Sequence, residues 1–269
     1  MGLDFNRGDD FQAMNRTILE RLSKIERKEH IQIIHAAESG SYAWGFSSVQ
    51  SDHDIRFVYV RPLEYYLRLD KTQDVIEYPQ SDHIDIIGWD LKKALKLLYK
   101  SNPTIFEWSH SPIIYRTSPQ WKEISEILND YFQSASGLHH YLNAAKHNYL
   151  DYLQDDIVRI KKYFYVIRPI LACKWILEKQ ETPPIIFLEL CQCENDPLIL
   201  KEIRQLLDLK MNNPEILQIK RIETLNAYIE RNISEIQNIL ADMPSSCDKD
   251  WNTLNRLFFN IVTDAKTVR

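Results

Sequence analysis

Apolar positions divide the chain into two unlike halves. In the first half, apolar residues at helical spacing predict an amphipathic helix over residues 10–29. Short apolar runs at residues 31–37, 54–60 and 83–87 predict buried strands, because polar or turn-forming residues bound them. Another helix is expected from about Asp90, whose side chain suits an N-cap. This half is therefore predicted to form a small sheet with flanking helices.

The second half is dominated by helical periodicity. From Ser118 onward the strand signals nearly stop, and prolines separate one helical pattern from the next. These patterns span residues 119–133, 138–154, 157–179, 196–210, 216–241 and 247–266. We therefore predict an α+β fold, in which residues 1–115 form a mixed sheet with flanking helices and residues 116–269 form an all-helical domain.

Composition narrows the class of protein. With 44% apolar and 26% charged residues among 269, the chain resembles an ordinary folded protein. Its formal charge of −5, from 33 basic and 38 acidic residues, means that net charge does not favour binding to nucleic acids. A local basic groove is compatible with this net charge. The four cysteines lack zinc-site spacing and are predicted to be free thiols. No apolar run matches a signal peptide or a membrane helix, so we expect a cytoplasmic protein that does not enter a membrane.

Candidate chemistry is concentrated in one short stretch. Gly40-Ser41 follows the first predicted strand, where a glycine turn exposes backbone N–H groups and the missing Cβ permits close approach of phosphate oxygens. Asp52 and Asp54 stand two apart at the start of the second strand, so their carboxylates project from one face. Two such carboxylates repel each other unless a cation bridges them, and Mg²⁺ prefers oxygen ligands together with substrate phosphates. The pattern predicts a site for Mg²⁺ (or Mn²⁺) and a phosphate-bearing substrate.

The order of these features resembles the signature of the DNA-polymerase-β superfamily of nucleotidyltransferases and, more narrowly, of the predicted RNA-ligase-associated branch. The matching segments are Glu38-Ser-Gly-Ser-x-Ala-Trp-Gly45, Ser51-Asp-x-Asp-x-Arg-Phe-x-Tyr59, Arg61-Pro-Leu-Glu-x-Tyr66, Gly88-Trp-Asp-Leu-Lys-Lys-Ala94, Asn102-Pro103 with Glu107-Trp108, and Lys162-Tyr-x-Tyr-x-x-Arg-Pro169. The likeness covers roughly residues 31–190. It implies a nucleotidyltransferase-type sheet and a metal-dependent reaction with an NTP.

The resemblance also implies a third carboxylate on a neighbouring strand, as a metal ligand or general base. Asp85 is the favoured candidate, because it lies in the apolar segment 84–87, where an uncompensated acid would be costly to bury. Asp90 is the rival candidate, although its place before a helix already provides it with a capping role. The predicted catalytic and metal-binding set is Asp52, Asp54 and Asp85.

Further residues near the aspartates are predicted to contact the nucleotide. Gly40, Ser41 and Ser51 are expected at the β- and γ-phosphates, although Ser51 has the alternative role of capping a strand. Arg56 shares the strand face of the aspartate pair. It would either contact a phosphate or form a salt bridge that orients the carboxylates.

The predicted helix of residues 157–179 carries a second set of candidates. Lys161, Tyr165 and Arg168 lie on one face at spacings of four and three, with Lys162 beside them. A cationic, aromatic face suits the phosphates and base of a nucleotide. The alternative is a solvated face that packs on the N-terminal half.

Together these features predict transfer of a nucleoside monophosphate from an NTP to an acceptor hydroxyl, with release of pyrophosphate. The acceptor is an RNA end, a protein side chain or a small molecule, because pocket shape and not the motif decides it. Two other classes stay open. One is a non-catalytic nucleotide-binding regulatory protein, and the other is a toxin–antitoxin-type interaction protein whose helical half binds a partner.

Overall fold

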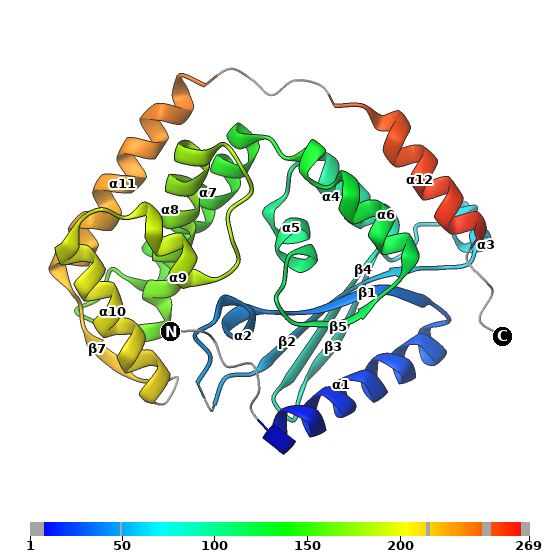
Figure 1. Ribbon diagram of the computed structural model, residues 1–269, viewed down its shortest axis with the longest axis horizontal. Helices are drawn as coiled ribbons and strands as arrows, with labels where there is room; N and C mark the ends of the chain where they lie inside the picture. The colour runs from blue at the N-terminus through cyan, green and yellow to red at the C-terminus, as the bar shows by residue number, and fades with distance from the viewer. Residues whose placement is uncertain (1–7, 49, 214–215, 244–248, 265–269) are drawn as a thin grey trace.

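A mixed five-stranded sheet forms the centre of the N-terminal half (Figure 1). The computed structural model describes residues 8–48, 50–213, 216–243 and 249–264. The strands are β1 (Gln32–Ser39), β2 (His53–Val60), β3 (Val75–Ser81), β4 (Ile84–Asp90) and β5 (Ile114–Thr117), in the spatial order β3-β4-β2-β1-β5. Only the β2–β4 pair is parallel among these neighbours. The predicted mixed sheet is confirmed.

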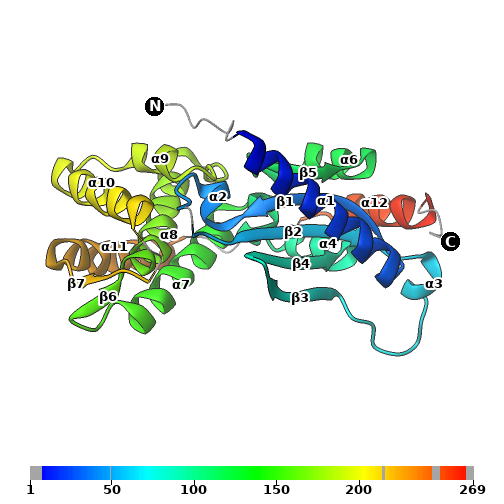
Figure 2. The ribbon, with the colours of Figure 1, turned by 90° about the horizontal axis from the view of Figure 1, so that it is seen from below.

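Helices cover both faces of this sheet (Figure 2). They are α1 (Gly8–Glu29) on one face, α4 (Leu91–Tyr99), α5 (Pro103–Ser109) and α6 (Pro119–Ile127) on the other, and the short α3 (Leu63–Tyr66) after β2. Strand β2 alternates between the two layers: Ile55, Phe57 and Tyr59 pack with α1, whereas Val58 and Val60 pack with α4 and α5. The two-residue period of β2 therefore decides which face each of its side chains reaches.

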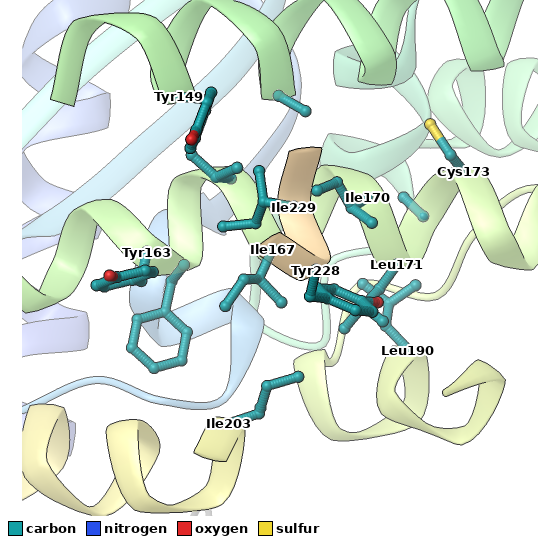
Figure 3. Packing of buried hydrophobic residues seen from close by; sticks show 14 of the residues in the cluster. Tyr149, Tyr163, Ile167, Ile170, Leu171, Cys173, Leu190, Ile203, Tyr228 and Ile229 are labelled. Atoms are coloured by element: carbon teal, nitrogen blue, oxygen red, sulfur yellow. The ribbon is translucent and has the colours of Figure 1, made fainter. Parts of the chain in front are cut away.

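The C-terminal half is built around α7 (Ser134–Tyr152) and α8 (Ile160–Lys179). Its other elements are α9 (Phe187–Leu190), α10 (Pro197–Asn212), α11 (Glu223–Ala241), the 3-10 turns Asn129–Tyr131 and Cys191–Cys193, and the paired strands β6 (Ile157–Arg159) and β7 (Gln218–Lys220). Figure 3 shows Ile167 and Leu171 of α8 among Ile203 of α10 and Ile229 of α11. Because α8 is buried along most of its length, it forms the centre of this helical core.

The last helix returns to the N-terminal half. Helix α12 (Trp251–Asp264) lies against α4, and its Leu254, Ile261 and Val262 are buried in the cluster that includes β2 and α4. The Trp251 ring stacks on Tyr99 with 3.7 Å between the ring centroids. Side chains from the end of the chain thus complete the N-terminal core, and the division at residues 115 and 116 stays a prediction.

The apolar pattern missed the two outer strands of the sheet. Strand β3 contains Pro79 and mostly exposed side chains, which an edge strand tolerates because one side of it needs no ladder hydrogen bonds. Strand β5 is four residues long and has no fully buried residue. Neither segment carries the apolar run that identifies an inner strand.

Two further expectations concern free cysteine thiols and the absence of membrane helices. Cys173, Cys191 and Cys193 are free thiols, as predicted, and Cys247 lies outside the described residues. None of the described helices is long and apolar enough to cross a membrane.

Candidate active site

The turn after β1 brings the backbone and a carboxylate into close contact. Gly40 begins the short helix α2 (Gly40–Trp44) with a φ of +61°, in the left-handed region that favours glycine. A Cβ on Gly40 would lie 2.0 Å from Asp54 Oδ2, because the neighbouring Ser39 pairs with Asp54 across the sheet. Position 40 therefore requires glycine both for its backbone conformation and for the space beside the carboxylate.

Asp54 and Asp85 meet at one end of the sheet. The parallel register of β2 and β4 sets the two residues opposite each other. Along β2, the buried Val60 and Val58 pack against helices, and Arg56 and Asp54 continue the same row as half-buried side chains. One sheet face thus contributes an apolar core at one end and a cluster of charged groups at the other.

Arg56 joins the two carboxylates. Its Nη2 donates to Asp54 Oδ1 at 2.9 Å and lies 2.8 Å from Asp85 Oδ2. The guanidinium also donates to the carbonyl oxygens of Ile55 and Asp85. Of the two roles that the sequence left open for Arg56, these contacts favour the salt bridge that orients the carboxylates.

A buried glutamate holds the backbone of Asp54. Glu38 is 1% exposed, and its Oε1 accepts a hydrogen bond from the Asp54 N–H at 2.7 Å. Its Oε2 faces His53 Nδ1 at 2.8 Å and accepts the Tyr115 hydroxyl. These polar partners compensate the burial of the carboxylate. Sequence reasoning assigned Glu38 no role, although it directly follows the apolar run 31–37 and an acid within an apolar run is the signal that favoured Asp85.

The surroundings of Asp54 disfavour its negative charge. Burial raises the pKa of Asp54 above its ordinary value, and the Arg56 guanidinium lowers it in part. The nearby carboxylates of Glu38, Asp85 and Asp52 raise it further. A bound cation would reverse this balance, because its positive charge favours the ionised carboxyl group.

A cavity of about 350 Å³ lies between these carboxylates and the helical half. Its walls include the predicted Gly40, Ser41, Asp52, Asp54, Arg56, Asp85, Lys161 and Tyr165. The fold therefore brings most of the predicted site residues to one place, from two strands, a turn and the first turns of α8.

Lys210 of α10 also lines this cavity, and sequence reasoning did not predict it as a site residue. It is 4% exposed, its Nζ donates to Ser51 Oγ at 3.1 Å, and the ammonium lies over the Phe46 ring at 5.4 Å from the centroid. The Ser51 hydroxyl also accepts the Ser48 N–H at 3.0 Å, so Ser51 belongs to a buried polar network with Ser48 and Lys210 and is not among the described lining residues of the cavity. The overlooked signal is a lysine in the apolar row of α10, three positions after Leu207.

Arg168 and Lys162 are not among the described residues that line this cavity. Arg168 is 5% exposed, its Nη1 donates to Glu107 Oε1 at 2.9 Å, and its guanidinium lies over the Trp44 ring at 4.5 Å. Lys162 lies over the Tyr152 ring at 3.4 Å from the centroid. Of the four residues predicted on this helix, the structure brings Lys161 and Tyr165 to the carboxylates.

The rival aspartate, Asp90, caps α4 as predicted. Its Oδ1 accepts the Lys92 N–H at 2.8 Å and its Oδ2 accepts the Tyr66 hydroxyl at 2.9 Å. The side chain is 3% exposed, and this burial raises the pKa of Asp90 to about 6. Asp90 is not among the described residues that line the carboxylate cavity, whereas Asp85 is.

The candidate metal ligands do not form a closed cage. Within the described part of the chain, no three His, Cys, Asp or Glu side chains are grouped so that they could hold an ion by themselves. Asp52 Oδ1 lies 2.9 Å from His83 Nδ1, whereas Asp54 and Asp85 each direct one oxygen to Arg56. Mg²⁺ commonly takes one or two carboxylates and completes its shell with water and phosphate oxygens. The donor set fits an ion that arrives with a nucleotide.

Comparisons with known proteins show the family of the chain. The chain is 38% identical to the uncharacterized protein YcgL of Bacillus subtilis (strain 168) over 253 residues, which cover 93% of this chain and 97% of that protein. A crystal structure of a nucleotidyltransferase-like protein from Exiguobacterium sibiricum 255-15 aligns at 12% identity and a TM-score of 0.31, covering 94% of this chain and 80% of that one. The model of one protein family matches residues 14–260 of the chain. By that match, the chain belongs to the RNA repair pathway DNA polymerase beta family, as the segments around Gly40 and Asp54 predict.

Proposed function

We propose that the protein transfers a nucleoside monophosphate from an NTP to an acceptor hydroxyl and releases pyrophosphate. One observation carries this proposal: Asp52, Asp54 and Asp85 line the same cavity as the Gly40 turn and the side chains of Lys161 and Lys210. Carboxylates on one wall and ammonium groups on another match the two demands of a triphosphate, which are cation ligands and countercharge.

The donor side of the reaction would be formed by the turn and the two lysines. The space beside Gly40 holds the Asp54 carboxylate, so the glycine keeps the backbone turn at Ser41 close to the metal ligand. Backbone N–H groups of that turn would contact the phosphate oxygens. Lys161 and Lys210 would neutralise negative charge on the β- and γ-phosphates, which increases on the leaving pyrophosphate. Because Lys210 is buried and belongs to the helical half, it would also hold that half against the phosphates.

The carboxylate side would hold the metal and activate the acceptor. Asp52 and Asp54 would be ligands of Mg²⁺ or Mn²⁺, which supplies Lewis-acid stabilisation of the phosphoryl oxygens when it is bound. Asp85 would accept the proton of the acceptor hydroxyl. Arg56 keeps Asp54 and Asp85 at a fixed separation through contacts of 2.9 and 2.8 Å.

The transfer is a single in-line displacement. The acceptor oxygen forms a bond to the α-phosphorus, the bond between that phosphorus and the bridging oxygen breaks, and the bridging oxygen leaves with pyrophosphate. The proton of the acceptor hydroxyl passes to the Asp85 carboxylate and then to water. Positioning and charge neutralisation supply the rate enhancement, so no covalent protein intermediate is required.

An RNA end is the acceptor that we favour. The support is the description of the family, which places its members in RNA repair. A protein side chain or a small molecule would require the same carboxylates and the same donor site.

A labelled-nucleotide assay tests the proposal. The purified protein is incubated with each of the four α-labelled NTPs, with Mg²⁺ or Mn²⁺, and with an oligoribonucleotide that has a free 3′-hydroxyl. We expect label in the RNA, and none with the matched variant Asp54→Asn. A parallel thermal melt reports NTP binding, because a ligand at a hundredfold excess over its Kd adds about 2.7 kcal/mol of stability.

The same assay separates the competing classes. Binding of NTP and metal with no transfer to RNA, to small molecules or to proteins of a lysate would favour a regulatory nucleotide-binding protein. A melting temperature that no NTP changes at millimolar concentration would contradict a nucleotide site. Co-purification of an equimolar partner in that case would favour an interaction protein of the toxin–antitoxin type.

A further inference from the structure

A second cavity adjoins the first one. It has a volume of about 420 Å³ and lies between α5, α7 and α8. Trp44 and Tyr165 belong to the walls of both cavities, so a ligand that extends past these two rings would reach from the carboxylates into the second space. A pocket of this size with aromatic walls and a few polar groups has the usual character of a small-molecule site.

Aromatic rings form one part of the walls of the second cavity. Phe164, Tyr141 and the two shared rings line it. The Tyr165 ring stands nearly perpendicular to Trp44, at 85° and 6.2 Å between centroids. Flat apolar walls of this kind favour a planar ring system, because ring faces stack and ring edges meet ring faces.

Polar side chains form another part of these walls, and they include a buried charge pair beside Asn102, Thr104, His140 and Asn148. Arg168 lines the cavity, and Glu107 Oε1 accepts hydrogen bonds from Arg168 Nη1 at 2.9 Å and from the Tyr141 hydroxyl at 3.0 Å. The Nε of Arg168 is buried and has no hydrogen-bond partner among the described residues. An unpartnered N–H on a side chain that is 5% exposed costs free energy unless an acceptor meets it. Because this atom is sealed, a ligand in the cavity would contact the remaining exposed part of the Arg168 guanidinium.

The number of cationic side chains distinguishes this cavity from the first one. The second cavity has one guanidinium, and Glu107 already neutralises it at 2.9 Å. The first cavity has Lys161 and Lys210 opposite the carboxylates. Phosphates would therefore favour the first cavity, and a neutral heteroaromatic ring with acceptor nitrogen or oxygen atoms would favour the second.

We infer that the second cavity binds a nucleobase, which packs against the partly exposed rings of Trp44 and Tyr165 and accepts a hydrogen bond from the Arg168 guanidinium. The inference deepens the proposed function and rests on it, because a nucleotide supplies both a base for this cavity and phosphates for the first. The base belongs either to the donor NTP or to a nucleotide of the acceptor, and the two sources differ in whether a free nucleoside competes with the NTP.

A steric block at Ala144 tests the inference. Ala144 lines the cavity from the exposed side of α7, so Ala144→Leu fills space without removing a buried contact. The matched control is Asn143→Leu, because Asn143 is an exposed neighbour on α7 and is not among the described lining residues. For the wild type and both variants, titrations measure the Kd of a non-hydrolysable NTP with Mg²⁺, of inorganic tripolyphosphate with Mg²⁺, and of free nucleosides.

Two results would support the inference. If the base of the donor occupies the cavity, Ala144→Leu weakens NTP binding at least about tenfold, tripolyphosphate binds as in the wild type, and nucleosides compete with the NTP. If the base of the acceptor occupies it, Ala144→Leu weakens nucleoside binding by a similar factor, and nucleosides bind the wild type equally well with the NTP present. Asn143→Leu should change none of these constants.

Other results would overturn it. Ala144→Leu with wild-type Kd values for NTP and nucleosides would exclude a base from this cavity, even if tripolyphosphate and metal bind as the proposed function expects. Failure of the proposed function has different signatures: tripolyphosphate, NTP and metal would all fail to bind the wild type if there is no nucleotide site, and NTP would bind without any transfer if the protein is regulatory. Equal losses in Ala144→Leu and Asn143→Leu would assign the effect to α7 itself and would also contradict the inference.

Discussion

Replacing Gly40 with alanine would test whether the position of Asp54 is what the reaction depends on. A Cβ at residue 40 would lie 2.0 Å from Asp54 Oδ2, and real contacts of this kind are essentially never below 3.0 Å, so the carboxylate must retreat by at least about 1 Å (3.0 − 2.0). The retreat would disturb the 2.9 Å contact between Asp54 and Arg56. The φ of +61° adds a separate cost of about 1–2 kcal/mol for a residue with a Cβ.

The expected effect on the rate exceeds the effect on stability. A displacement of about 1 Å at a reacting centre costs about a hundredfold in rate. At 1.36 kcal/mol per factor of ten, this is about 2.7 kcal/mol of transition-state stabilisation. We therefore expect Gly40→Ala to lose about 10²-fold in kcat/KM for nucleotidyl transfer and about 1–2 kcal/mol of folding free energy.

The control for backbone strain is Gly45→Ala. Gly45 ends α2 with a φ of +83°, so its substitution carries a similar backbone cost. Urea unfolding should show comparable destabilisation of the two variants, and the transfer assay should show a large loss for Gly40→Ala alone. A Gly40→Ala protein with wild-type kcat/KM, or equal losses of activity in both variants, would refute the reasoning that displacement of Asp54 causes the effect.

Three further predictions concern side chains of the site and its surroundings. Asp52→Asn and Asp54→Asn should each abolish transfer without unfolding the protein, whereas Asp85→Asn should lose transfer but retain NTP binding better. Full activity of both Asp52→Asn and Asp54→Asn in the labelled-nucleotide assay would contradict the metal mechanism. Lys210→Met keeps the length of the buried side chain but removes the ammonium group. A titration should therefore show that Mg²⁺–NTP binds more weakly by about 1.5–3 kcal/mol. An unchanged Kd would show that Lys210 does not contact the nucleotide. Asp90→Asn should keep activity, because asparagine also caps helices. The pKa of Asp90 is about 6 in the folded protein against an ordinary 3.8, so folding binds a proton at pH values between these two. The stability of the wild type should therefore fall as pH rises from about 4 to about 6, by on the order of 3 kcal/mol relative to Asp90→Asn. Urea unfolding measures this, and a stability difference between the two proteins that does not change with pH would contradict the prediction.

The central part of the site was predictable because local sequence decides it. The two-residue period of a strand places Asp54 and Arg56 on one face, and an acid inside an apolar run identifies Asp85. The glycine turn is likewise a local property of the chain. These features depend on neighbours within a few residues, so they can be inferred before the fold is known.

The remainder of the site depends on contacts between distant segments. Lys210 meets Ser51 across 159 positions, and no periodicity in either segment indicates that partnership. Arg168 lies on the helix face that spacing predicts, but Glu107 and Trp44 hold it in a neighbouring cavity. Tertiary packing therefore decided which cations reach the carboxylates.

The return of α12 has a consequence for how the protein is made. Its Leu254, Ile261 and Val262 fill the same core as Val58 and α4, although the ribosome synthesises them more than 150 residues later. Domains usually fold as units in the order of their synthesis. Here the N-terminal sheet emerges first with one flank uncovered, and that flank is closed only after α12 has been synthesised. The core of the N-terminal half is thus completed after the helices of the other half have been translated.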